Sequence, residues 1–361
     1  MSRVAVLGGG AGGLSSAVEL TQAGHEVRLW NRSPRTIEPY SGRVVRFGGV
    51  LGSGAERLAA VTTDLGAALE GADAAVVCLP ALAHEALFAD LAAHRLAVPV
   101  VLNPGHTGGA LHARAVFATL GAALPPLAEL STLTYVARVQ PGGELRITCR
   151  AGQVRCGALP GGEGATDVAC ALFPGVRRVA DVLASSLSNV NLVLHPPGAI
   201  LAAAWVESPG QDFTFYVEAM TPGVGRVIEA LDGERRALAA RVGHDLPPLI
   251  EEMVAIGTAS TEQAARGDVA EAIRSGEANR SIAAPSSLAH RYYAEDLPFA
   301  LTPFVTLARL ADARTPTAEA LLEIGGTLLG RDLVATGLGA QALGIKGLDL
   351  AGLLDLVRGA R

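Results

Sequence analysis

A glycine-rich loop at the start of the chain constrains its fold more than any other feature. Residues 3–7, RVAVL, form a short apolar run typical of a buried strand, and a second such run, EVRLW, covers residues 26–30. Between them lie GGGAGG, with the spacing G-x-G-x-x-G at Gly8, Gly10 and Gly13, and an amphipathic segment. A strand, a glycine loop, a helix and a second strand within about 30 residues predict a Rossmann-type dinucleotide-binding unit.

The glycine loop predicts where a dinucleotide would bind. Without side chains the backbone approaches a pyrophosphate closely, and the N-terminus of the following helix supplies free N–H groups and a partial positive charge. The alternative is a tight strand–helix turn that holds no ligand. The residues predicted to contact the cofactor here are Gly8, Gly10, Ala11, Gly12 and Gly13.

The residues after the second strand bear on which dinucleotide binds. NAD sites usually carry Asp or Glu there, which accepts a hydrogen bond from the 2′-hydroxyl of the ribose. This chain has Asn31, Arg32 and Ser33 instead, and Arg35 follows closely. Arginine and serine donors suit a 2′-phosphate, so the sequence predicts NADP in preference to NAD. The alternative is that the two arginines belong only to a solvated turn.

The alternation of strand-like and helix-like segments continues. Two further apolar runs are typical of buried strands, and each is followed by a candidate ligand contact. After the first, Pro80 and Ala81 are expected beside the nicotinamide ribose. After the second, His106 is predicted to lie in a loop above the cofactor, where it could contact the substrate. Strand-like runs between residues 133 and 180 are expected to extend the same sheet.

Beyond about residue 183 the pattern becomes helical. The expected helices cover about 183–206, 222–242, 298–312 and 315–330. For the second of them, Thr221 is the predicted N-cap and Pro222 the first helical residue. The predicted fold is therefore an α/β Rossmann-type dinucleotide-binding domain, residues 1–182, followed by an all-α C-terminal domain, residues 183–361.

Two segments of the second half carry candidate chemistry. In LSNVNLVLHPPG, Asn191 lies one helical turn before His195, and the two prolines that follow are expected to end the helix and hold His195 at a bend. In HRYYAEDLPFALTP, Arg291 and Asp296 lie close together in the sequence. The simpler interpretation is a buried structural histidine and a charged helix start. The functional interpretation is that Asp296 orients His195 for proton transfer while Arg291 binds a carboxylate.

Composition narrows the classes of function. The 361 residues carry a net charge of −6 without any basic run, which argues against nucleic acid or an anionic membrane as a partner. Four cysteines without a CxxC pair predict reduced, packed thiols rather than disulfides or a metal site. Because the chain starts directly with a strand, a cytoplasmic location is expected. The only lysine, Lys346, lies near the C-terminus, which excludes a mechanism based on a mid-chain lysine.

Whole motifs of the chain resemble the opine dehydrogenase family, the octopine and nopaline dehydrogenase group, and in particular its bacterial N-(1-D-carboxyethyl)-norvaline dehydrogenase type. The resemblance is nearly full length. Besides the glycine loop it rests on NPG-x-TGGAL at 103–111, ELSTLTYVAR at 129–138, LSNVNLVLHPPG at 187–198, FTFYVEAMTPGVG at 213–225, RYYAEDLP at 291–298 and GLDLAGLLDLV at 347–357.

This resemblance implies an activity and a set of residue roles. Such enzymes join the amino group of an amino acid to an α-keto acid, usually pyruvate, and reduce the resulting imine with NAD(P)H to a secondary amine dicarboxylate. The resemblance makes His195 and Asp296 the catalytic pair and Arg291 the ligand of the keto-acid carboxylate. The residues expected to contact substrate are Arg291, Asn191, His106 and Tyr292.

Other functions stay open at this point. Glycerol-3-phosphate dehydrogenases and ketopantoate reductases also combine a dinucleotide domain with a helical one, but they rely on a lysine in the helical domain that this chain lacks. A nucleotide-binding sensor that has lost its activity is a second alternative, and an enzyme that builds a metal-binding opine from a large amine is a third. Alanine-rich apolar helices at 199–206 and 317–328 suggest a homodimer.

Overall fold

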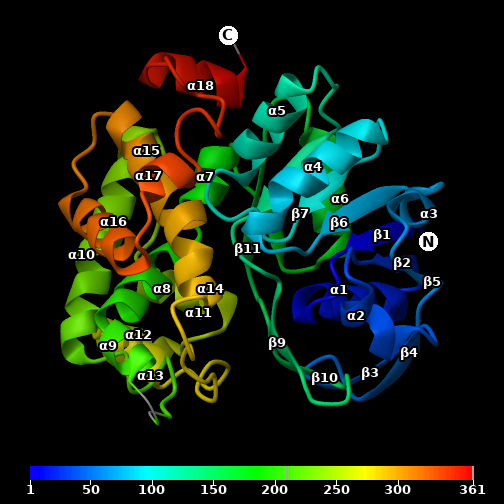
Figure 1. Ribbon diagram of the computed structural model, residues 1–361, viewed down its shortest axis with the longest axis horizontal. Coiled ribbons are helices and arrows are strands. Elements are labelled where there is room, and N and C mark those ends of the chain that lie inside the picture. Colours follow the sequence, from blue (N-terminus) through cyan, green and yellow to red (C-terminus); the bar gives the residue numbers. More distant parts are fainter. Residues whose placement is uncertain (209, 211, 360–361) are drawn as a thin grey trace.

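The computed structural model describes residues 1–208, 210 and 212–359, and its two halves lie side by side in Figure 1. The first half is built on an eight-stranded sheet in the order β12-β11-β8-β7-β6-β1-β2-β5. Its neighbouring strands are parallel except for the antiparallel pair β8 and β11. The strands are β1 (Arg3–Leu7), β2 (Glu26–Trp30), β5 (Ala60–Thr62), β6 (Ala74–Val77), β7 (Val100–Leu102), β8 (Leu127–Leu130), β11 (Val154–Ala158) and β12 (Val176–Arg178).

The central strands are buried because helices cover the sheet. Every residue of β7 and the last four residues of β1 are fully buried, which explains why these strands read as continuous apolar runs in the sequence. The glycine loop leads from β1 into α1, which packs on β2, while α6 packs on β8 and β11. The helices of this half are α1 (Ala11–Gln22), α2 (Pro34–Ile37), η1 (Glu38–Tyr40), α3 (Leu65–Leu69), η2 (Ala81–Ala83), α4 (His84–Ala93), α5 (Gly109–Thr119) and α6 (Glu163–Leu172).

A second, four-stranded sheet corrects part of the expectation for residues 133–180. Its order is β4-β3-β10-β9, and it lies at the lower edge of the first half in Figure 1. Only β11 and β12 extend the main sheet as expected, and residues 167–172 belong to helix α6, not to a strand. In α6 the buried residues Ala165, Ala169 and Leu172 follow a helical spacing. The strands of the second sheet are β3 (Val44–Gly49), β4 (Gly54–Arg57), β9 (Tyr135–Val139) and β10 (Leu145–Arg150).

The second half consists of helices and loops, and its described residues contain no strand apart from one isolated bridge between Thr214 and Ala283. The predicted cap at Thr221 is confirmed, because its side chain accepts a hydrogen bond from the Val224 amide and Pro222 follows as the first helical residue. The helices are α7 (Val182–Ser186), α8 (Val190–Leu201), α9 (Ala203–Glu207), α10 (Pro222–Arg241), α11 (Leu249–Ile256), α12 (Thr261–Ala265), α13 (Val269–Arg274), α14 (Arg291–Ala294), η3 (Leu297–Leu301), α15 (Thr302–Leu310), α16 (Pro316–Leu329), α17 (Leu333–Thr336) and α18 (Leu350–Arg358).

The helix expected at 183–206 differs in two ways. It is divided into α7, α8 and α9, and at the first division the Asn189 side chain accepts from the Asn191 amide and caps the start of α8. The expectation that Pro196 and Pro197 end the helix is wrong: both lie inside α8. Each proline removes one backbone donor, yet residues 192–200 are all buried, so packing on every side holds the helical path. His195 therefore lies in a helix and not at a bend.

The structure confirms the predicted fold class, an α/β Rossmann-type half followed by a helical half. The division at residues 182 and 183 remains a proposal. No helix among the described residues is long and apolar enough to cross a membrane.

Candidate active site

His195 is held in the interior by hydrogen bonds at both ring nitrogens. Its Nδ1 lies 2.7 Å from Oδ2 of Asp296, which directly precedes η3, and its Nε2 lies 2.7 Å from the hydroxyl oxygen of Tyr216. All three residues are buried. A carboxylate accepts and does not donate, so the Asp296 contact places the hydrogen on Nδ1 and leaves Nε2 as the nitrogen that exchanges a proton.

Aromatic rings enclose this histidine. The Tyr292 ring lies 4.0 Å from the His195 ring, centroid to centroid, at 32°, and its hydroxyl oxygen is 3.5 Å from that of Tyr216. Burial raises the pKa of Tyr216 well above its usual value and also raises that of Tyr292, so both hydroxyls stay protonated near neutral pH. Sequence reasoning missed Tyr216, although it lies in the segment 213–225 that carries part of the family resemblance.

Glu295 is a second residue that sequence reasoning missed. It is fully buried, its Oε1 accepts a 2.8 Å hydrogen bond from the Ala81 amide, and the same oxygen is 3.2 Å from Nε2 of His106. Its Oε2 is 3.1 Å from Nε of Arg291. The sequence predicts only a charged helix start for this segment, because nothing in the chain indicates which distant groups surround the carboxylate.

The predicted substrate contacts are distributed around these groups. Arg291, the first residue of α14, has a half-exposed side chain, whereas Tyr292 is buried against His195. His106 is buried rather than open above the cofactor loop, and burial lowers its pKa, so its ring is neutral near pH 7. Asn191 lies at the start of α8, and its backbone amide donates to the Asn189 side chain. Substrate contact by these four residues remains a prediction.

The geometry of the glycine loop fits a dinucleotide. Gly8 has φ of +128°, and a Cβ there would lie 2.4 Å from the Cys78 carbonyl oxygen. A Cβ at Gly13 would lie 1.8 Å from the Gly8 carbonyl oxygen, so α1 packs directly on the turn. At Gly10, the N-cap of α1, a Cβ would meet no atom within 4 Å. The loop is therefore closed toward the sheet and open at the helix N-terminus, as pyrophosphate binding requires.

The segment after β2 borders a small cavity of about 120 Å³. Asn31, Arg32 and Ser33 line one side, and residues of α4 including Asp90 line the other. The Asn31 side chain accepts from the Gly9 amide and donates to the Ser33 carbonyl oxygen, so it braces the loop. The side chains of Arg32, Ser33 and Arg35 are exposed. Pro80 and Ala81 follow β6 at the same edge of the sheet, and the predicted cofactor contacts of all these residues remain predictions.

Comparison with known proteins identifies the family. The chain is 31% identical over 359 residues to an opine dehydrogenase of Arthrobacter sp. (strain 1C), a match that covers 98% of both chains. The family described as NAD/NADP octopine/nopaline dehydrogenase, alpha-helical domain, matches residues 178–329. The chain belongs to the opine dehydrogenase family.

Solved structures of the family share the fold over nearly the whole chain. Octopine dehydrogenase with NADH and L-arginine superimposes with a TM-score of 0.75 at 19% identity, covering 98% of both chains. Yersinopine dehydrogenase with bound NADP⁺ gives a TM-score of 0.72 at 14% identity, covering 100% of this chain and 98% of that one. These likenesses support the fold. The first of the two structures contains NADH and the second contains NADP⁺.

The membership establishes the class of enzyme. The protein is an NAD(P)-dependent oxidoreductase that acts on CH–NH bonds, and its reaction is the NAD(P)H-dependent reductive condensation of an amino acid with an α-keto acid. The family described as NAD-dependent glycerol-3-phosphate dehydrogenase N-terminus matches only residues 3–103. That match covers the dinucleotide-binding part, which several dehydrogenase families share.

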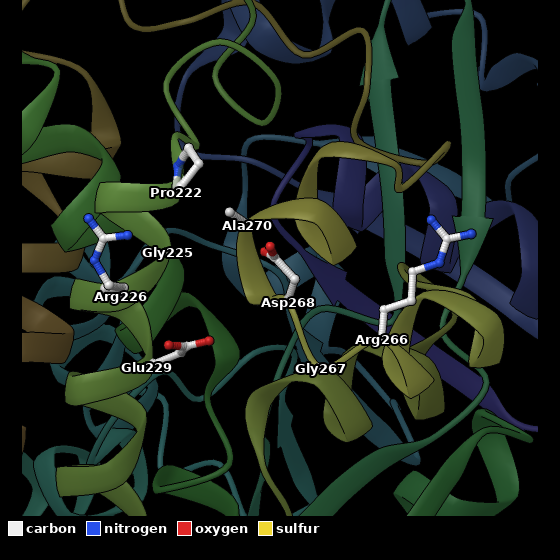
Figure 2. Close-up of a pocket in the computed structure, with 8 residues that line it drawn as sticks. All are labelled: Pro222, Gly225, Arg226, Glu229, Arg266, Gly267, Asp268 and Ala270. Atoms are coloured by element: carbon white, nitrogen blue, oxygen red, sulfur yellow. The ribbon is translucent and has the colours of Figure 1, made fainter.

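Two further features lie apart from the residues around His195. Among the described residues, no group of three or more His, Cys, Asp or Glu side chains could hold a metal ion, and all four cysteines are free thiols. A crevice of about 260 Å³ lies between α10 and α13 (Figure 2). There the guanidinium groups of Arg226 and Arg266 point away from the gap between the helices, so they do not form a clamp for a carboxylate.

Proposed function

We propose that the protein reduces the imine formed between an amino acid and a small α-keto acid such as pyruvate, using NADPH in preference to NADH. The observation that carries the proposal is the hydrogen bond between His195 and Asp296, which joins α8 to η3 across 101 residues in the buried part of the helical half. Such a pair suits the proton transfers that this condensation needs.

The proposed roles follow from the geometry. Asp296 holds the ring of His195 so that Nε2 is the nitrogen that gives or takes the proton. Nε2 first takes a proton from the ammonium group of the amino acid, which frees the amine to attack the keto acid, and then gives this proton to the carbinolamine oxygen, which leaves as water as the C=N bond forms. Tyr216, hydrogen bonded to Nε2, donates to the neutral ring and accepts from the charged one. General acid–base help of this kind accelerates a reaction by about 10²–10⁴-fold.

The cofactor would lie along the loop from Gly8 to Gly13, with its adenosine half toward Arg32. When bound, NADPH supplies the hydride that reduces the imine carbon. The preference for NADPH is supported by the neutral Asn31 at the end of β2 and by the exposed donors of Arg32, Ser33 and Arg35. None of the three carries a negative charge that would repel a 2′-phosphate.

The substrate would lie between the two halves. Arg291 would bind the carboxylate of the keto acid through its guanidinium group, a planar donor that matches a carboxylate in two-point contact. Tyr292, Asn191 and His106 would shape the rest of the pocket.

We further propose a homodimer in the cytoplasm. The exposed apolar side chains of Leu201, Trp205 and Ile324, in the two alanine-rich helical segments, support the dimer.

A cofactor-oxidation panel tests this function. Purified protein is mixed with NADPH, pyruvate and each of a set of amino acids, and the loss of NADPH absorbance is followed, with NADH in parallel. We expect oxidation only when the keto acid and an amino acid are both present, and a secondary amine dicarboxylate by mass spectrometry. Bound NADPH without oxidation by any pair would instead indicate a nucleotide-binding sensor.

A further inference from the structure

Glu295 is unusual because it is a fully buried carboxylate that touches both halves of the protein. We propose that Glu295 is a positioning residue: it fixes Arg291 relative to the loop at Ala81, and so sets where the keto-acid carboxylate binds with respect to the cofactor. This inference rests on the proposed function, because it concerns the same substrate site. Glu295 acts through Arg291 and does not itself touch the substrate.

The contact with Arg291 is an ion pair at the Nε end of the guanidinium group. Glu295 Oε2 lies 3.1 Å from Nε without hydrogen-bond geometry, and the two residues are one helical turn apart. No other described residue forms an ion pair or a hydrogen bond with the Arg291 side chain, which is 48% exposed. The two terminal nitrogens therefore remain available as a fork for an incoming carboxylate.

The contact with Ala81 connects this arginine to the first half of the chain. The Ala81 amide donates to Glu295 Oε1 over 2.8 Å and across 214 residues. Ala81 follows β6, at the edge of the sheet where the nicotinamide is expected, so one carboxylate group holds a cofactor-side loop and a substrate-side arginine. A shift of either partner changes the distance between the two bound molecules, and hydride transfer is sensitive to shifts of about 1 Å.

The buried polar groups around Glu295 have incomplete hydrogen bonding, so stability of the fold does not explain why a charge is kept here. Four buried side-chain polar atoms of the described residues lack a hydrogen-bond partner, and three belong to His106, Glu295 and Asp296. His106 Nε2 is near Glu295 Oε1, but the contact does not have hydrogen-bond geometry. Buried charges with incomplete hydrogen bonding cost stability, and apolar residues commonly replace them without loss. Their concentration at this one place indicates a functional reason for the charge.

The substitution Glu295→Gln separates the two contacts. The glutamine oxygen still accepts from the Ala81 amide, but the amide nitrogen then faces the donor at Arg291 and the ion pair is lost. We expect KM for pyruvate to rise about 10- to 100-fold, while the Kd of NADPH, measured by fluorescence titration, changes less than about threefold. Glu252→Gln is the matched control, because Glu252 is also a buried carboxylate paired with an arginine, Arg155, outside the site. It should leave both constants at wild-type values.

A double-mutant cycle distinguishes positioning from a general structural effect. If Glu295 acts through Arg291, then adding Glu295→Gln to Arg291→Ala should lower kcat/KM for pyruvate by less than about threefold. An equal loss in both backgrounds would overturn the proposal, and so would a wild-type KM in Glu295→Gln. Should Glu295→Gln fail to fold, Glu295→Asp, which keeps the charge on a shorter side chain, carries the same comparison.

A binding measurement keeps this inference separate from the proposed function. The Kd of pyruvate for the complex with NADP⁺ is measured by calorimetry for the wild type, Glu295→Gln and Glu252→Gln. If the wild type binds pyruvate without any turnover, the proposed function fails, yet a 10- to 100-fold weaker Kd in Glu295→Gln alone still supports the positioning role. Equal pyruvate affinity in all three proteins overturns it.

Discussion

Replacing Asp296 by asparagine removes one charge while it preserves the shape of the side chain. In the wild type, Oδ2 of Asp296 is 2.7 Å from Nδ1 of His195, with side-chain exposures of 0% and 5%. Asparagine can still contact Nδ1, but it no longer stabilises the positive charge that the ring carries when it holds a second proton.

The expected loss follows from the proton transfer at His195. General acid–base catalysis contributes about 10²–10⁴-fold, which is about 3–5 kcal/mol of barrier at 1.36 kcal/mol per factor of ten. We therefore expect kcat of Asp296→Asn to fall by about 10²–10⁴-fold. The Kd of NADPH should stay within about threefold of the wild-type value, because Asp296 is not among the residues expected to bind the cofactor.

The assay is steady-state NADPH oxidation at saturating pyruvate and amino acid, with NADPH binding measured separately. Asp181→Asn is the control: Asp181 is equally buried and its Oδ1 is 2.8 Å from Nε2 of His244, but this pair lies outside the site. The control should keep wild-type kcat within about twofold. If Asp296→Asn retained more than about a tenth of the wild-type kcat, the assigned role of the pair would be refuted.

Further predictions concern the cofactor loop, the choice of cofactor and the pH dependence of stability. Gly13→Ala should lower stability by about 1–3 kcal/mol in urea unfolding, because its Cβ would lie 1.8 Å from a backbone carbonyl oxygen, whereas Gly10→Ala should keep wild-type stability and weaken only NADPH binding. A larger loss of stability in Gly10→Ala than in Gly13→Ala would contradict the loop geometry. Arg32→Ala and Arg35→Ala should each raise the Kd of NADPH about tenfold and leave that of NADH within about twofold; equal changes for both cofactors would rule out a role at the 2′-phosphate. Burial raises the pKa of Glu129 from 4.5 to about 7, despite hydrogen bonds from two serine hydroxyls and a backbone amide. The folded state then binds more protons than the unfolded state between these values, so this group's contribution of at most about 3 kcal/mol falls as pH rises through that window. Glu129→Gln should therefore reduce the difference in unfolding free energy between pH 5 and pH 8, and an unchanged difference would contradict the assignment.

The sequence allows some features to be predicted because they depend on local pattern. The spacing of Gly8, Gly10 and Gly13 between an apolar run and an amphipathic segment predicts a strand, a glycine loop and a helix, and the structure has β1, the loop and α1 in this order. Thr221 and Pro222 likewise predict a helix start from neighbouring residues alone.

Other features depend on packing between distant segments. Pro196 and Pro197 locally favour the end of a helix, but burial on all sides keeps them helical. Tyr216 and Glu295 have no pattern of their own, and only the folded chain brings them to His195 and Arg291. The closeness of His195 and Asp296 follows from the family resemblance rather than from spacing, because they lie 101 residues apart.

Proton transfer by His195 is tested by comparing the wild type with His195→Ala in the full reaction with NADPH, pyruvate and an amino acid. Product is identified by mass spectrometry, and NADPH binding and thermal unfolding confirm that both proteins are intact. We expect a secondary amine dicarboxylate from the wild type and a variant that binds NADPH but turns over at least about 10²-fold more slowly. A folded His195→Ala protein with wild-type turnover would contradict this role of His195.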